Sequence, residues 1–235
     1  MNVRSQKRLG SKDLVNTAHQ YCPPLEPFLD ILYQDESILV LNKPSGLLSV
    51  PGRAAEHQDS LVLRAQSRFP SALTVHRLDM ATSGVTVLAL NKASHRELSR
   101  QFQERETYKV YYAWVWGEVA QASGEVDLPL ICDWPNRPLQ MVDHEQGKTA
   151  LTRWQRVRVE QGNSLMKLLP HTGRSHQLRV HMQAIGHAIL GDDFYAGRDA
   201  LAAADQLQLH AAELGFMHPE LGDDLLFECE PPFEI

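Results

Sequence analysis

Residues 76–84 read His-Arg-Leu-Asp-Met-Ala-Thr-Ser-Gly and place a carboxylate, Asp79, two residues from a guanidinium, Arg77. They lead directly into residues 85–90, an apolar segment with the composition of a buried strand. A carboxylate at such a junction is held by rigid structure and can still be reached by a substrate. The nearby guanidinium favours the ionised carboxylate, the form that a nucleophile or a base needs. A surface turn with an incidental ion pair would contain the same residues.

Basic side chains follow this stretch closely in the sequence. Residues 91–104 have good helix composition, with an Asn available as a cap at the start. On such a helix Lys92, Arg96 and Arg100 recur every four residues and therefore share a face. A cationic stripe beside a candidate carboxylate suits a polyanionic substrate, because phosphates supply most of the affinity for nucleic acids. A solvated helix face balanced by neighbouring glutamates is the alternative interpretation.

A second polar segment, residues 171–181, begins with a turn and continues into a predicted helix over residues 175–185. Its guanidinium groups, Arg174 and Arg179, could reach the Asp79 carboxylate, or an anion beside it, with bidentate geometry. Histidines recur every five residues in this segment, which separates successive side chains on a helix by about 140°. The histidines therefore do not predict a metal site.

Residues 108–116 are aromatic and β-branched and predict a strand, on which Lys109 and Tyr111 share one face. Most aromatic side chains of this kind belong to a core. A tyrosine beside a charged cleft can instead stack on an extruded base and use its hydroxyl group as a donor. Asp192 and Asp193 are adjacent in a Gly-Asp-Asp-Phe-Tyr sequence, and we interpret them as part of a turn because neighbouring side chains point apart.

The chain has 235 residues, of which 43% are hydrophobic and 22% charged, as in an ordinary globular protein. Strands separated by hairpin turns outnumber βαβ units, so we expect one α+β domain with a mixed, mostly antiparallel central sheet flanked by helices. The predicted strands cover residues 37–41, 85–90, 108–116, 124–131, 149–159, 164–169, 207–216 and 225–227. A further short helix is predicted over residues 60–65, capped by Asp59.

The formal net charge is −6, but the charge is distributed unevenly. Nine of the 29 acidic residues and none of the 23 lysines and arginines follow Arg198, which leaves 20 acids against 23 bases in residues 1–198. We interpret the acidic C-terminal segment as a solvated edge. The three cysteines are isolated and the N-terminus lacks an apolar signal core, which favours the cytoplasm and predicts neither disulfides nor a membrane segment.

Four motifs in this order resemble the RluA family of pseudouridine synthases. They are residues 42–48 (Asn-Lys-Pro-Ser-Gly-Leu-Leu), residues 76–84, the strand over residues 109–117 and residues 173–179 (Gly-Arg-Ser-His-Gln-Leu-Arg). The resemblance implies the pseudouridine synthase fold with a catalytic cleft over residues 25–235. It leaves residues 1–24 as a loosely ordered polar extension, too short for the S4 domain that some relatives carry.

The resemblance also implies an activity, the isomerisation of uridine to pseudouridine in RNA, which requires neither a cofactor nor a metal. Asp79 matches the catalytic nucleophile and Arg179 the arginine that pairs with it, although Arg174 lies in the same motif. Tyr111 matches the tyrosine that stacks on the target uracil, and Arg77 the arginine that helps to displace the base. Besides Arg77 and Arg174, the candidate RNA-binding residues are His176 and the basic stripe.

Residues 49–53 and 127–138 are most similar to the short, dual-specificity branch of the family, which acts on 23S rRNA and on the tRNA anticodon stem-loop. We therefore expect both RNAs as partners of a chain that works as a monomer. Two other functions remain open on the sequence alone. One is an RNA-binding module without chemistry; the other is a hydrolase that uses Asp79, although the second carboxylate usual in glycosidases is not evident.

Overall fold

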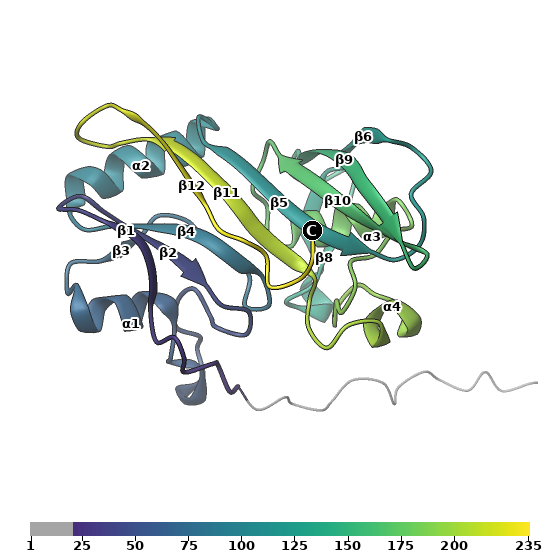
Figure 1. The fold of residues 1–235 in the computed structure, drawn as a ribbon, viewed down its shortest axis with the longest axis horizontal. Helices are drawn as coiled ribbons and strands as arrows, with labels where there is room; N and C mark the ends of the chain where they lie inside the picture. The colour runs from purple at the N-terminus through teal and green to yellow at the C-terminus, as the bar shows by residue number, and fades with distance from the viewer. Residues whose placement is uncertain (1–20) are drawn as a thin grey trace, which may run out of the picture.

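The computed structural model describes residues 21–235, and its main feature is a ten-stranded sheet that runs across the molecule (Figure 1). The strand order is β1-β2-β4-β11-β5-β10-β9-β6, while β3 also pairs with β4 and β12 with β11. The strands of this sheet are β1 (Asp30–Gln34), β2 (Ile38–Lys43), β3 (Leu73–Thr74), β4 (Ser83–Ala89), β5 (Tyr108–Val115), β6 (Ser123–Asp127), β9 (Leu151–Glu160), β10 (Asn163–Pro170), β11 (Leu209–Met217) and β12 (Asp224–Glu228). A separate two-stranded sheet pairs β7 (Leu130–Cys132) with β8 (Gln140–Val142).

The helices divide between the two ends of the sheet. In Figure 1, α1 and α2 lie with β1–β4 at one end, and α3 and α4 lie with β6–β10 at the other. The helices are α1 (Leu61–Arg68), α2 (Lys92–Glu104), α3 (Gln177–Ala184) and α4 (Arg198–Ala202), and two short 3₁₀ segments are η1 (Ala55–His57) and η2 (Trp134–Asn136). Within residues 21–235 the named strands of the large sheet pair antiparallel apart from β4 with β11, which confirms the expected α+β class.

Strand β11 holds the two ends of the sheet together, because it inserts between β4 and β5. Ala211 on β11 is opposite Gly84 on one side and opposite Tyr111 on the other. Gly84 has φ +118°, and a Cβ atom there would lie 2.2 Å from the Ala211 carbonyl oxygen, so only glycine fits. This close parallel contact places the loop that carries Asp79 beside the strand that carries Tyr111.

Buried apolar side chains form a core on each side of this central strand. One cluster joins β2 and β4 to α2 and β11 through residues such as Val40, Leu98 and Phe216. Another joins β5 and β10 to α3 through residues such as Met166 and Met182. Both ends of the sheet are therefore anchored independently, and the polar segments between them lie at the junction.

Several expectations about local structure are confirmed and two are wrong. The α2 helix begins where predicted, with the Asn91 side chain accepting a hydrogen bond from the Ser94 backbone at 2.8 Å. The predicted Asp59 cap is wrong, because Ser60 is the N-cap residue and Asp59 instead forms a bidentate ion pair with Arg64. The single strand expected over residues 124–131 is also wrong, because strand structure is interrupted at Leu128 and Pro129, and β6 and β7 belong to different sheets.

The acidic C-terminal segment is not simply a solvated edge. It supplies β11, a largely buried strand at the centre of the sheet, whose Glu213 pairs with Lys167 at 3.7 Å. The physical reason is long-range pairing, which the charge pattern of the segment does not reveal. The exposed acids of β12, such as Asp224 and Glu228, do fit the expectation.

Residues 1–20, most of the predicted N-terminal extension, lie outside the described residues. Tyr21 contacts the domain, since its hydroxyl group donates to the Asp59 carbonyl and accepts from the Leu48 backbone N–H. Among residues 21–235 there is no helix with the length and apolarity that a membrane crossing requires.

Candidate active site

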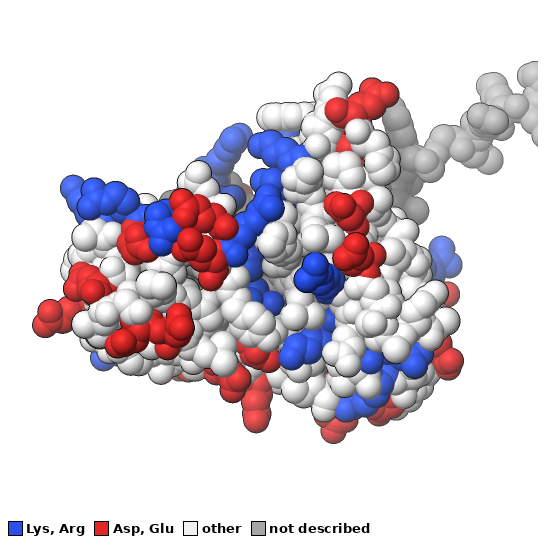
Figure 2. Space-filling view, turned by 90° about the horizontal axis from the view of Figure 1, so that it is seen from above, with Lys and Arg blue, Asp and Glu red and all other residues white. Residues whose placement is uncertain are grey.

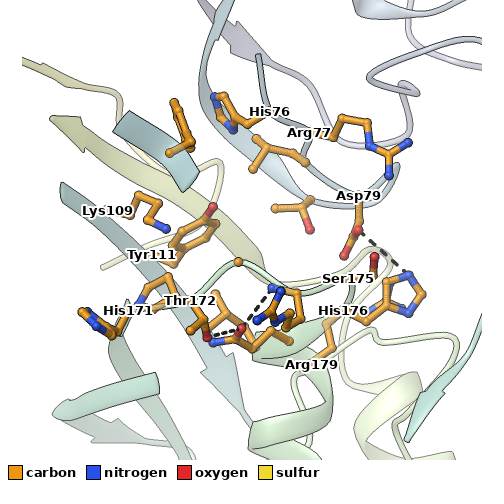
Figure 3. Close-up of a pocket in the computed structure, with 18 of the residues that line it drawn as sticks. His76, Arg77, Asp79, Lys109, Tyr111, His171, Thr172, Ser175, His176 and Arg179 are labelled. Carbon is orange, nitrogen blue, oxygen red and sulfur yellow. Dashed lines mark hydrogen bonds and ion pairs between the residues drawn. The ribbon is translucent and has the colours of Figure 1, made fainter. Parts of the chain in front are cut away.

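A cavity of about 470 Å³ lies at the junction between the two ends of the sheet (Figure 3). Three separate parts of the chain line it. They are the loop with His76, Arg77 and Asp79, strand β5 with Lys109 and Tyr111, and residues 170–179, which connect β10 to α3. Its size is within the range of about 300–1,000 Å³ usual for small-ligand pockets. Three of the motifs singled out in the sequence therefore meet in one cavity.

The first motif supports the Asp79 loop from behind. Lys43 is fully buried, and its ammonium group donates to the carbonyl oxygens of Pro44, Leu47 and Met80 at 2.7–3.0 Å. Burial lowers the pKa of Lys43 to about 7, while the negative charge of Asp79 acts in the opposite direction. The three carbonyl acceptors also favour the ammonium form, because only that form has three hydrogens to donate. Lys43 thereby fixes the backbone next to the candidate nucleophile.

His76 supports the same loop from the other side. Its ring stacks on Phe102 of α2 with centroids 4.3 Å apart, and its Nε2 atom accepts a hydrogen bond from the Val87 backbone at 3.2 Å. Burial, followed by the positive charge of Lys109, lowers the pKa of His76 to about 3. A neutral imidazole is required for that acceptor role. His76 therefore ties the loop to β4 and α2 as an uncharged group.

Asp79 remains accessible and faces a histidine. Its side chain is 30% exposed, and its Oδ1 atom lies 4.0 Å from Nε2 of His176 (Figure 3). Tyr111 points into the same cavity from β5. Burial and then the Asp79 charge raise the pKa of the Tyr111 hydroxyl, so Tyr111 is a neutral phenol at neutral pH. The predicted shared face of Lys109 and Tyr111 is confirmed, since both line the cavity.

A chain of hydrogen bonds determines which nitrogen of His176 carries the proton. The Gln140 backbone N–H donates to the Tyr195 hydroxyl at 2.8 Å, and this hydroxyl lies 2.7 Å from Nδ1 of His176. Because the Tyr195 oxygen already accepts from Gln140, we infer that Tyr195 donates its own proton to Nδ1 of His176, which gives that proton a partner. The pattern assigns the hydrogen of the neutral ring to Nε2, the atom that faces Asp79. Burial lowers the pKa of His176, which favours this neutral form.

The structure corrects the expected partner of Arg179. The guanidinium group of this buried residue binds both oxygens of Asp192 and one oxygen of Asp193, the latter at 2.9 Å. Burial lowers the pKa of Arg179, but the hydrogen bonds and charge of Asp192, followed by the charges of Asp79 and Asp193, raise it above its usual value. The two aspartates occupy a turn, as expected, because Asp192 accepts the backbone N–H of Phe194. Their side chains nevertheless converge on one cation, contrary to the interpretation that they point apart.

The predicted RNA-binding residues divide into two groups. Arg77, Arg174 and His176 line the cavity. The predicted basic stripe, Lys92, Arg96 and Arg100, does not, and Arg100 is bound by Glu97, Glu104 and Glu106. Three carboxylates already balance the charge of Arg100, and a role of the stripe in RNA binding outside the cavity stays a prediction. The described cavity instead draws its other cations from Arg105 and Lys109, which follow the helix.

The histidines of the third motif do not converge in space. His171 lines the cavity, whereas His181 is buried and contacts Thr152 and the Leu128 carbonyl. Within residues 21–235 there is also no cluster of three potential metal ligands.

Four functional residues were not found by the sequence argument. Lys43 lay in a recognised motif, but only the fold shows its three carbonyl acceptors. Asp192, Asp193 and Tyr195 were interpreted as a turn, and the Gly-Asp-Asp-Phe-Tyr spacing contains no local sign of their partners. The ion pairs of Arg179 with the two aspartates, and the contact of Tyr195 with His176, arise because this turn packs against the start of α3.

The α+β fold, with a carboxylate, a tyrosine and basic side chains in one cavity, agrees with the RNA-modifying isomerases that comparison with known proteins identifies. Residues 37–184 match the RNA pseudouridylate synthase family. Because this match covers more than half of the chain, the protein belongs to that family, as the four motifs indicated.

Two proteins with similar sequences are both described as dual-specificity RNA pseudouridine synthases. A "Dual-specificity RNA pseudouridine synthase RluA" from Yersinia pestis is 61% identical over 204 residues, which are 86% of this chain and 99% of that protein. The protein of the same description from Escherichia coli K12 is 58% identical over 214 residues, 91% of this chain and 98% of the relative. The solved structure of human RNA pseudouridylate synthase domain containing 1 is 28% identical, with a TM-score of 0.73, and covers 88% of this chain and 84% of the human one.

Proposed function

We propose that this chain converts uridine to pseudouridine in two RNAs, 23S rRNA and the tRNA anticodon stem-loop. The observation that carries the proposal is the single cavity that combines Asp79 and Tyr111 with basic side chains. The dual-specificity description of relatives about 60% identical supports the choice of two RNA classes.

In this reaction the N1–C1′ glycosidic bond breaks, the uracil rotates, and C5 bonds to C1′. The hydrogen on C5 leaves to water and N1 gains a proton, so the nucleotide keeps its composition. No oxidant or reductant is needed. The Asp79 carboxylate acts at C6 of the uracil, at C1′ or on a sugar proton. Each route requires an ionised carboxylate held in a fixed position, and the Lys43 and His76 contacts provide that position.

Two groups stabilise the charge of Asp79. Arg179 supplies a permanent positive charge, since a guanidinium does not titrate at working pH. The Asp192 and Asp193 carboxylates hold it in place, where it acts on Asp79 as a nearby charge without direct contact. His176 is a positioning residue that directs its Nε2–H at the carboxylate. Hydrogen bonds at a catalytic site are often long before the substrate binds.

The remaining side chains handle the RNA. Extruding a base costs a few kcal/mol, which stacking and phosphate contacts must offset. Tyr111 stacks on the extruded uracil, and its protonated hydroxyl can donate to it. Arg77 is exposed at the cavity mouth, where it can take the place of the base in the RNA stack. Arg174 is anchored to the Thr149 carbonyl at 3.1 Å and contacts the backbone phosphates.

The test uses RNA that contains 5-tritiated uridine, because the C5 hydrogen is lost in the reaction. Wild type should release tritium from both an anticodon stem-loop and a 23S rRNA fragment. Asp79→Asn, which keeps the shape of the side chain, should abolish release and still bind RNA. The exposed, remote substitution Asp199→Asn is the matched control and should behave as wild type.

Other products would identify the alternatives. Free uracil would indicate a hydrolase, and RNA binding without turnover would indicate a module without chemistry. Full activity of Asp79→Asn would contradict the assignment of the nucleophile. We further propose that the chain acts in the cytoplasm as a monomer without metal or cofactor, so tritium release should persist in EDTA and gel filtration should give the mass of one chain.

A further inference from the structure

A second, larger cavity of about 1,040 Å³ adjoins the first. Both are lined by Asp79, with Arg77 on one side and His176 on the other. The proposed site of the target uracil uses only the first cavity. The second cavity extends from Asp79 toward the surface, and the proposed reaction places no part of the target uracil in it.

Two surface segments form the walls of this second cavity. One is the loop after β2, represented by Ser49, Val50 and Arg53. The other is the hairpin over residues 130–142, which contains β7, η2 and β8 and forms its own small sheet. This hairpin is fixed to the domain where the Gln140 backbone N–H donates to Tyr195, so it is a firm wall.

The hairpin carries an aromatic ring in an unusual position. Trp134 is 64% exposed, and it lies beside Pro135 and Arg137, which both line the cavity. The Arg137 guanidinium covers one face of the indole, 4.6 Å from its centroid, and its Nε–H donates to the Trp134 carbonyl at 3.1 Å. This stacking fixes the orientation of the indole ring and leaves its other face exposed to solvent. An exposed, braced indole is suited to stacking on another flat group.

The side chains that line the second cavity carry an excess of positive charge, which favours the binding of an anion. Four arginines line it, Arg53, Arg77, Arg137 and Arg179, against two aspartates, Asp79 and Asp193. Arg179 is already neutralised by aspartates, whereas no ion pair is formed by Arg53, Arg77 or Arg137 within residues 21–235. Figure 2 shows lysine and arginine side chains along a hollow on one face, with acidic side chains beside it.

We propose that the second cavity binds the single-stranded RNA nucleotides next to the target uridine. In this arrangement a neighbouring base stacks on Trp134, and phosphates lie between Arg53 and Arg137. The proposal rests on the proposed function, because it places the flanking nucleotides relative to a uridine at Asp79. Grooves that bind single strands combine these two elements, a positive lining and an aromatic platform.

Such a platform also suits an enzyme with two RNA substrates. Stacking on an aromatic ring tolerates any base, because every base has a flat face. Holding the neighbouring nucleotide out of its own stack lowers the cost of extruding the target uridine. The second cavity thus supplies affinity for a distorted loop without selecting one sequence.

The experiment measures KM and kcat for tritium release from an anticodon stem-loop at fixed salt. Trp134→Ala should raise KM about tenfold, in line with the loss of one stacked base, with kcat nearly unchanged. Arg137→Met should raise KM in the same direction. The matched controls are Trp116→Ala, which removes another exposed tryptophan, and Arg158→Met, which removes an arginine stacked on Trp114 outside the cavity.

A second arm removes bases rather than side chains. Each stem-loop in a series carries one abasic nucleotide at a different position flanking the target. One of them should raise the KM of wild type about tenfold and leave the KM of Trp134→Ala unchanged. Wild-type KM in both cavity variants, or additive losses at every abasic position, would overturn the proposal. If wild type releases no tritium from any RNA, the proposed function fails by itself. Fluorescence anisotropy with the same stem-loops then decides the binding proposal, which equal affinities of wild type and Trp134→Ala would overturn.

Discussion

Tyr195 offers the sharpest test of the reasoning about Asp79, the proposed catalytic carboxylate, because the Tyr195 hydroxyl group acts on Asp79 only through His176. Tyr195→Phe removes one oxygen, which accepts from Gln140 at 2.8 Å and contacts Nδ1 of His176 at 2.7 Å. The ring is retained, so its edge-on packing against His176 and its contact with the Arg179 guanidinium should survive. The substitution therefore frees the imidazole while changing the shape of the site very little.

The expected decrease in kcat follows from the hydrogen bond that the His176 imidazole loses in Tyr195→Phe. Without the hydroxyl, neither the ring orientation of His176 nor the hydrogen on its Nε2 atom is fixed. A hydrogen bond to a charged group contributes about 1.5–3 kcal/mol. The His176–Asp79 contact is 4.0 Å here, and a hydrogen bond at that place forms when the substrate complex tightens the site. Partial loss of that bond should cost about 1.4 kcal/mol, a tenfold decrease in kcat. KM should change much less, because Tyr195 lies behind His176 and does not line either cavity.

The assay is a double-mutant cycle on the kcat of tritium release, with Tyr195→Phe, His176→Ala and the double variant. If the hydroxyl acts only through His176, the double variant should be no slower than His176→Ala. Independent losses that multiply in the double variant would refute the relay. Tyr33→Phe is the matched control, since its hydroxyl group donates to Asp35 at 3.0 Å far along the chain from the site.

Two further predictions concern groups that support the site or the sheet. Lys43→Met should leave three carbonyl groups unpaired around the Asp79 loop, at a cost of about 1–3 kcal/mol for each unsatisfied group. Urea unfolding should therefore show a loss of at least about 3 kcal/mol, and a loss below about 1 kcal/mol would contradict the assigned role. His210, bonded to Ser83 at 2.8 Å, has its pKa lowered to about 4 by burial, whereas an unfolded histidine titrates near 6.5. Its stabilising contribution is therefore complete above pH 6.5 and declines as the pH falls toward 4, by about 2 kcal/mol at pH 5. In His210→Gln the difference in unfolding free energy between pH 7 and pH 5 should shrink by about that amount, and an unchanged difference would show that His210 is not the group responsible.

Much of the fold follows from local sequence. Helix α2 begins at its predicted asparagine cap, and the β9–β10 hairpin forms around the predicted Gln-Gly-Asn turn. These features depend on backbone periodicity, caps and turns, whose causes lie within a few residues. The place of β11 was not predictable in this way. Its pairing with β4 and β5 joins residues more than ninety positions apart, and no local pattern specifies that choice.

The sequence by itself determined which chemical groups the site carries and which family the motifs indicate. These groups are a carboxylate at Asp79 and a tyrosine two positions beyond Lys109. Only the tertiary structure decided which charges work together. Arg179 binds Asp192 and Asp193, and His176 faces Asp79. The physical reason is that a motif fixes the type of a side chain, whereas the partner of a charge depends on which distant segments pack beside it.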